Sequence, residues 1–302
     1  MNEISKRNIL AFITVFLWAS AFPLTKIAMN HYSPNSLGFI RCSIASIFLI
    51  ILGILNNIRK PKAKDIPLFF ISGALGFTLY MITFNTGIHS LTSATSSIVI
   101  ATTPIMTAIA ASKCYKEKIN TLGWFSILLA FVGVLILLLS NGIFSINIGL
   151  VWTVTAAIVF CFYNILNRKL SSMRYTALEI VTYSMICGTI LLSIFSFKSF
   201  NQLTTSKPEH ILSVIYLGAF PSAIAYFFWG RALSLAKKTS DVTNFMFVTP
   251  LLSSILGFLI LKEIPTISTF MGGGIIIISV IIFNLKDQLI KLLFKPSKNN
   301  YY

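Results

Sequence analysis

Apolar residues follow one another in runs of about 20 along most of this chain, and short polar segments separate the runs. A helical run of that length crosses the roughly 30 Å of hydrocarbon in a bilayer. The runs predict ten membrane-spanning helices, at 8–28, 36–56, 66–86, 93–112, 121–140, 149–167, 177–197, 211–231, 241–261 and 266–285. The longest connection, near 197–210, is too short to form a domain.

The same pattern favours helices over a transmembrane β-barrel. Barrel strands alternate apolar and polar residues in segments of about ten, whereas the stretches at 133–140 and 272–283 are apolar on every face. Helices satisfy their own backbone groups in lipid. The sequence therefore predicts an all-α membrane protein with the lipid bilayer as its surroundings. Its composition agrees, since 56% of the 302 residues are hydrophobic and only 11% are charged, against about 25% charged in soluble domains.

The net charge of +16 suggests either a nucleic-acid partner or a membrane topology signal. Position decides between them, because most of the 24 Lys and Arg residues fall on every second connection, at 6–7, 59–64, 113–118, 168–174, 231–238 and 286–298. This distribution follows the positive-inside rule. We expect a multi-pass protein of a prokaryotic cytoplasmic membrane with both termini in the cytoplasm, and no nucleic-acid partner.

A secretory signal peptide is the alternative interpretation of the first run, since small residues follow it at 18–22. The run is too long for a usual signal-peptide core, and it has a counterpart later in the chain, so we reject that alternative. The four cysteines and three histidines are scattered, without metal-binding spacing. No metal, cofactor or catalytic residue is predicted.

Two distant segments share a pattern of Thr-Pro, a mostly apolar stretch and Lys-Glu. At an offset of 146 residues, Thr103-Pro104 matches Thr249-Pro250 and Lys116-Glu117 matches Lys262-Glu263. At an offset of 142, Lys26 falls on Arg168. These matches predict an internal repeat, residues 1–141 and 142–302, with five spans in each unit.

Five is an odd number, so the second unit must enter the membrane from the opposite side. Inverted units can exchange conformations and expose a shared central site first to one side and then to the other. The pattern therefore indicates a carrier that works by alternating access. The alternatives are an integral-membrane enzyme, which needs clustered reactive side chains that we do not find, and a membrane scaffold or receptor.

The sequence W-A-S-A-F-P-L-T-K from Trp18 to Lys26, the two Thr-Pro pairs and the Lys-Glu pairs resemble the EamA-type members of the drug/metabolite transporter superfamily. The resemblance covers about residues 8–285. It implies a ten-helix inverted-repeat bundle that exports or exchanges small metabolites, commonly amino acids, through a cavity lined mainly by spans 1, 3, 4, 6, 8 and 9. One departure is Leu261-Lys262-Glu263, where many members have Leu-Gly-Glu.

Two prolines, Pro104 and Pro250, interrupt apolar helices and predict kinks, either for packing or for gating beside a cavity. Glu117 and Glu263 close the same spans. We expect capping or inter-helix anchoring from them in preference to proton transfer. Glu179 and Asp241 fall in first helical turns, where a cap is favoured on dipole grounds.

Lys26 and Arg41 are charges within spans, which are costly and usually face the interior of a bundle. They suggest a positive site for a substrate carboxylate or other anion, although snorkelling to the headgroups explains Lys26 equally well.

Aromatic and amide side chains complete the candidate substrate site. They are Trp18, Phe22, Tyr80, Asn85, Tyr163, Asn164, Tyr226, Trp229 and Asn244. Hydrogen bonding between helices is the competing explanation for the polar ones. The small residues at 71–76 and 271–279 predict close helix packing and not a phosphate-binding loop. The solute, the coupling ion and a homodimeric state are left open.

Overall fold

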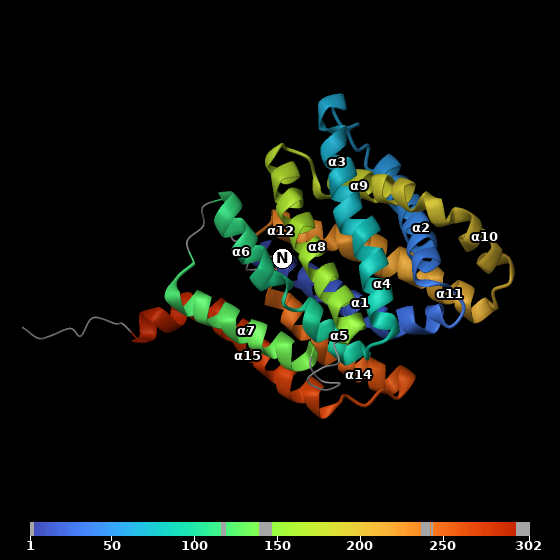
Figure 1. The fold of residues 1–302 in the computed structure, drawn as a ribbon. Helices are drawn as coiled ribbons and strands as arrows, with labels where there is room; N and C mark the ends of the chain where they lie inside the picture. Colours follow the sequence, from blue (N-terminus) through green and yellow to red (C-terminus); the bar gives the residue numbers. More distant parts are fainter. Residues whose placement is uncertain (1–2, 116–118, 139–146, 237–241, 243, 294–302) are drawn as a thin grey trace, which may run out of the picture.

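In the computed structural model, residues 3–115, 119–138, 147–236, 242 and 244–293 are described (Figure 1). Helices account for the secondary structure of these residues, and there is no strand among them, so the predicted all-α fold is confirmed. Lys116, Glu117 and Asp241 lie outside the described residues, and the side chain of Asn244 is likewise not described.

Each predicted span falls on a helical segment. The first half contains α1 (Glu3–Met29), α2 (Pro34–Leu55), α3 (Ile66–Gly73), α4 (Tyr80–His89), α5 (Ser93–Ile100), α6 (Thr103–Tyr115) and α7 (Thr121–Leu138). The second half contains α8 (Ile148–Ser172), α9 (Ala177–Leu192), α10 (Ser196–Thr204), α11 (Pro208–Leu217), α12 (Ala225–Ser234), α14 (Thr249–Leu261) and α15 (Ile267–Leu293).

Seven helical segments of the described residues are long and apolar enough to cross a membrane: Glu3–Met29, Pro34–Leu55, Ala63–His89, Ser93–Tyr115, Ile148–Ser172, Ala177–Thr204 and Pro208–Ser234. The other three, Thr121–Ile136, Thr249–Leu261 and Ile267–Phe283, are apolar and shorter. The chain is therefore a multi-pass membrane protein.

The segment around 197–204, expected to be a connection, is helical instead. After a single 3-10 turn, α10 continues the direction of α9 as far as Thr204. Apolar side chains on α10 alternate with polar ones at helical spacing, which lowers the hydropathy of the segment without preventing a helix. Phe200 of α10 contacts Phe39 of α2, with 6.3 Å between ring centroids.

Four irregular segments interrupt or precede helices within the predicted spans. Two are π-helical, η2 (Ala74–Leu79) between α3 and α4, and η4 (Gly218–Ile224) between α11 and α12. The third is the break between α5 and α6, and the fourth is the 3-10 helix η5 (Asn244–Val248) before α14. All four lie within apolar segments, where an irregular backbone is tolerated only if protein or a cavity surrounds it.

Helix ends follow from local sequence. Thr176 and Glu179 form a capping box at the start of α9, and the Glu179 carboxylate also accepts hydrogen bonds of 2.9 and 3.0 Å from the Arg59 guanidinium. The expected cap is thus confirmed, and these hydrogen bonds raise the pKa of Arg59. Lys262 ends α14 in the left-handed conformation, with φ 56°. Glycine adopts that conformation at least cost, so Lys262 occupies a position that favours glycine.

The helices from the two halves of the chain pack against each other. α7 and α15 run side by side along one edge (Figure 1), and α2 packs on α9. Two further pairs surround the centre: α4 packs on α8, and α12 packs on α1. Between them lies a core of large aromatic side chains.

Glycines let these helices approach closely, as the small-residue segments predicted. A Cβ on Gly73 would lie 2.5 Å from the carbonyl oxygen of Ser184, and one on Gly218 would lie 3.0 Å from the carbonyl oxygen of Arg41. Gly273 is likewise pressed against Ile98. These contacts confirm the packing seams.

The contrast between two glycines gives a test of this packing. We expect Gly73→Ala to destabilise the protein by about 1–3 kcal/mol, because a methyl group there meets backbone that cannot rotate away. Gly274→Ala is the matched control, since a Cβ at Gly274 has nothing within 4 Å. Thermal unfolding in detergent measures both. Equal melting temperatures for the two variants would contradict the proposed role of the close contact.

Candidate functional site

A small cavity lies at the centre of the bundle, surrounded by the irregular segments. Its volume is about 30 Å³, room for about one or two water molecules. Its lining comes from spans 1, 3, 4, 6, 8 and 9, as the family resemblance implied, and also from span 2. The lining residues are Trp18, Ala21, Phe22, Arg41, Tyr80, Phe84, Ile100, Ala101, Phe160, Tyr226, Met246 and Thr249.

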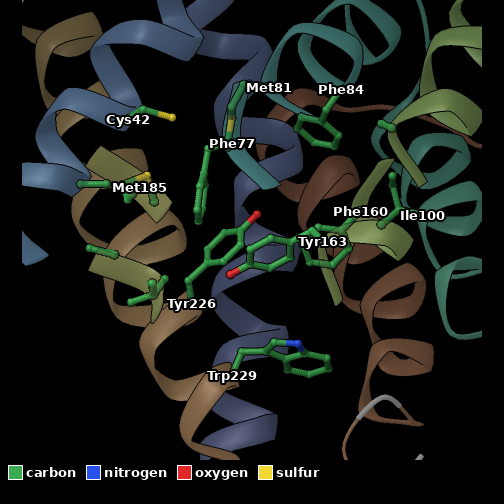
Figure 2. Close-up of a cluster of buried hydrophobic side chains, with 14 of the residues drawn as sticks. Cys42, Phe77, Met81, Phe84, Ile100, Phe160, Tyr163, Met185, Tyr226 and Trp229 are labelled. Carbon is green, nitrogen blue, oxygen red and sulfur yellow. The ribbon is translucent and has the colours of Figure 1, made fainter. Parts of the chain in front are cut away.

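Aromatic rings form most of the cavity wall. Trp18 makes edge contacts with Phe160 and Tyr226, with centroids 5.9 and 5.4 Å apart. Tyr80 stacks on Phe84 at 5.4 Å. Figure 2 shows Tyr163, Tyr226 and Phe160 close together at the centre. Such walls suit an apolar or aromatic ligand body, which gains dispersion and ring contacts there.

Arg41 provides the charge at this cavity. Its side chain is 3% exposed, and its Nε donates to the Ser222 Oγ at 2.6 Å, while Nη1 donates to the Thr25 Oγ1 at 3.4 Å. Within the described part of the chain, no carboxylate lies within ion-pair distance of Arg41. A guanidinium held only by neutral hydroxyls retains a strong preference for a carboxylate or another anion.

The two Thr-Pro pairs stand where helices restart beside the cavity. Pro104 is the second residue of α6, and because proline has no N–H, it leaves the carbonyl of Ile100 without its usual donor. The Thr103 Oγ1 donates to that carbonyl at 2.6 Å. Pro250 is the second residue of α14, but the buried Thr249 Oγ1 has no hydrogen-bond partner among the described residues. The Thr249 hydroxyl is thus available at the cavity, whereas the Thr103 hydroxyl is bonded to its own backbone.

Lys26 lies one helical turn beyond the cavity and is paired. Its ammonium group forms an ion pair with Glu263 and donates to the Leu91 carbonyl at 2.7 Å. The other Glu263 oxygen accepts from the Ser93 N–H at 2.7 Å, at the start of α5. The expected anchoring role of Glu263 is confirmed, and Lys26 is part of that anchor at a separate pocket of about 290 Å³.

The remaining candidates whose side chains the structure describes lie outside the cavity. The Asn85 Nδ2 donates to the Pro34 carbonyl at 2.9 Å and so joins α4 to α2. Tyr163 and Trp229 are buried behind the lining, against Tyr226 and Trp18 respectively. Asn164 lines a different cavity, with Asn167 and Arg168.

Several residues of the site were not foreseen. Ser222 does not line the cavity but holds the lining residue Arg41. It follows Pro221 inside an apolar segment, and that proline is the signal that could have drawn attention to it. Phe84 and Phe160 are ordinary apolar residues without a distinguishing pattern. His31 and His210 were expected to be scattered, yet their rings stack at 5.2 Å between centroids. No group of His, Cys, Asp or Glu that could hold a metal ion occurs among the described residues.

Comparison with known proteins identifies the class. The model of the EamA-like transporter family matches residues 5–139 and again residues 147–285. The chain therefore belongs to the EamA-like transporter family. Transport, and not catalysis, is the activity of this class.

Curated relatives match over nearly their whole length. The transporter YdfC of Bacillus subtilis (strain 168) is 29% identical over 93% of this chain and 92% of its own. A protein of Streptantibioticus cattleyicolor named "Probable terminal-alkyne amino-acid exporter" is 27% identical over 90% and 91%. Escherichia coli (strain K12) has a relative named "Probable amino-acid metabolite efflux pump", 23% identical over 90% and 92%.

The fold also occurs among solved structures. One crystal structure aligns with 95% of this chain and 99% of its own, with a TM-score of 0.67 and 16% sequence identity. At that identity the likeness supports the fold alone.

The asymmetry of the Thr-Pro pairs predicts unequal effects on stability. Thr103→Val should cost about 1–3 kcal/mol, because it leaves a buried carbonyl without a donor. Thr249→Val should be neutral or slightly stabilising, because it removes a hydroxyl that has no partner in the described structure. Melting temperatures of the two purified variants in one detergent provide the measurement. An equal decrease in melting temperature in both variants would show that the two hydroxyls contribute equally to stability, which contradicts the prediction.

Proposed function

We propose that this protein is a secondary transporter that exports a small amphipathic carboxylate, an amino acid or a related compound, across the cytoplasmic membrane by alternating access. The observation that carries the proposal is Arg41, a buried guanidinium held by hydroxyls alone at an aromatic cavity. The site combines a group for the substrate carboxylate with walls for an apolar body.

Each part of an amino acid has a counterpart at this site. Arg41 binds the carboxylate, the rings of Trp18 and Tyr80 contact the side chain, and the free Thr249 hydroxyl accepts a hydrogen bond from the ammonium group. Two relatives with amino acids in their printed names support this substrate class. The same chemistry accommodates other carboxylates with an apolar body.

The proposed mechanism requires the cavity to change size. A volume of about 30 Å³ is roughly a tenth of the smallest usual ligand pocket, about 300 Å³. Substrate entry therefore requires the surrounding helices to separate. The four irregular segments around the cavity are suitable hinge positions, because their backbone is already partly released from regular hydrogen bonding.

Inverted symmetry between units 1–141 and 142–302 would allow the helices to separate on one side of the membrane and then on the other. Three features support it: the family model matches twice, π-helical turns occur in the third and eighth predicted spans, and helix pairs α4–α8 and α1–α12 pack in matching positions. With both termini in the cytoplasm, the basic connections are cytoplasmic as well. Two inverted units can then open the central site to either side in turn.

The topology has a direct test in matched connections. Lys64 precedes the third predicted span and Lys207 precedes the eighth, and both are exposed. In a variant without native cysteines, we expect a membrane-impermeant maleimide to label Lys207→Cys in intact cells and Lys64→Cys only after permeabilisation. Labelling of both from the same side would contradict the inverted arrangement.

The carboxylate site can be tested by counterflow in proteoliposomes with a panel of labelled L-amino acids. We expect Arg41→Gln to raise the half-saturating concentration about tenfold or more, because it removes a charge-assisted pair. The exposed Arg231→Gln on α12 is the control and should leave the value unchanged.

A second comparison separates charge recognition from misfolding. The wild type should discriminate an amino acid from its uncharged amide, and Arg41→Gln should lose that discrimination while still carrying both. Equal discrimination by the two proteins would remove Arg41 from the site. Absence of saturable flux for every compound would overturn the proposed function.

A further inference from the structure

A second cavity lies at the C-terminal ends of α8 and α12, apart from the central one. Its volume is about 80 Å³, larger than that of the central cavity. No residue lines both. Its polar lining consists of Asn164, Asn167, Arg168, Ser171 and Ser234.

Asn164 is the unusual member of this lining. Its side chain is 7% exposed, and both its Nδ2 and its Oδ1 are buried without a hydrogen-bond partner among the described residues. By contrast, Asn167 donates from its Nδ2 to the Tyr163 hydroxyl at 3.2 Å. An amide buried with a donor and an acceptor both unused costs stability unless something occupies the cavity beside it.

Helix register places this cavity next to the central one. Asn164 follows Phe160 by four residues on α8, and Gly230 follows Tyr226 by four on α12. Residues four apart lie on one face of a helix, about 6 Å along the axis. On both helices, the second cavity is therefore one turn nearer the C-terminal end than the central cavity.

Tyr163 contacts a lining residue of each cavity. Its ring lies 6.0 Å from that of Tyr226, which lines the central cavity, and its hydroxyl accepts the hydrogen bond from Asn167, which lines the second. Both rings are visible at the centre of Figure 2.

The pocket beyond the other end of the central cavity is different. Lys26 follows Phe22 by four residues on α1, and it lines that pocket together with Glu263. There the charges satisfy one another through the ion pair. None of the residues lining that pocket has a buried polar side-chain atom without a partner in the described structure, whereas Asn164 has two.

We propose that the second cavity is a loading site for the zwitterionic head of an α-amino acid. The Asn164 Nδ2 donates to the carboxylate and its Oδ1 accepts from the ammonium group, while the Arg168 guanidinium adds a positive charge to the same lining. The substrate waits there before it passes the Tyr163–Tyr226 pair. This inference rests on the proposed function, because it assigns a second station to the same substrate.

The first test compares affinities from the two sides of the membrane. In oriented proteoliposomes, Asn164→Leu should raise the half-saturating concentration roughly tenfold from the side of the α8 C-terminus, the loss expected of one polar pair. From the opposite side the value should stay within about twofold. Thr155→Val is the control, because Thr155 lies on the same helix, lines neither cavity and donates its hydroxyl hydrogen bond to the Val151 carbonyl. Unchanged values from both sides would identify ordered water as the occupant, and equal changes from both sides would assign Asn164 to the central site; either overturns the loading site.

A chemical readout keeps the inference testable without transport. In a background lacking the native cysteines, Asn164→Cys should react with an anionic, impermeant methanethiosulfonate from that side, and the L-amino acids of the panel should slow the reaction. Ser172→Cys, at an exposed position at the C-terminal end of the same helix outside the cavity lining, should react at a rate the amino acids do not alter. Protection of the Asn164→Cys variant without any flux would support the site while the proposed function failed. Flux without protection would overturn the site and leave the function standing.

Discussion

The structure depends on one constraint, that a backbone N–H or carbonyl in hydrocarbon has no water to bind and must find its partner within the protein. Regular helices meet this requirement alone, so an irregular backbone needs other support. Four of the irregular segments lie at one cavity: Ala101, in the break before α6, and Met246 of η5 line it, the lining residue Tyr80 follows η2, and Ser222 of η4 holds the lining residue Arg41. Where support is visible it is specific, as when the Trp18 indole donates to the Pro221 carbonyl at 3.1 Å.

The chemistry of the central site follows from that arrangement. Close helix contacts at Gly73 and Gly218 bring spans together so that aromatic rings fill the space between them. Within this low-dielectric surrounding, the Arg41 charge is costly. Two hydroxyls hold the guanidinium in place without neutralising it. A substrate carboxylate would recover the Coulomb energy that the protein itself leaves unused, and this is why Arg41 dominates the proposed function.

Sequence alone predicted the fold well, because the free energy of burying apolar residues in lipid is readable from local composition. The spans, the packing glycines and the roles of Glu179 and Glu263 were all accessible in this way. α10 was not predicted as a helix. Its apolar and polar residues alternate at helical spacing, so the hydropathy averaged over the segment is as low as that of a polar connection.

The candidate site was harder to predict, for a geometric reason. Composition gives the depth of a residue along its helix but not the direction in which its side chain faces. Tyr163 and Asn164 are neighbours in sequence, yet consecutive residues on a helix are about 100° apart, so Tyr163 packs behind the central cavity and Asn164 lines another. Lys26 was predicted as a charge in a span, but its partner Glu263 lies 237 residues away. No local pattern joins two such residues.

The two segments that match the family model, 5–139 and 147–285, place different chemistry at the central cavity. Thr103 spends its hydroxyl on the backbone carbonyl released by Pro104, whereas the corresponding Thr249 keeps its hydroxyl unused at the cavity. Arg41 occurs in the first unit, and the Ser222 that orients it comes from the second. Both segments match the same family model and provide similar helical frameworks. Recognition of an asymmetric solute then requires each copy to place different groups at the shared centre, so in this family the positions where the copies differ are the ones to examine for substrate choice.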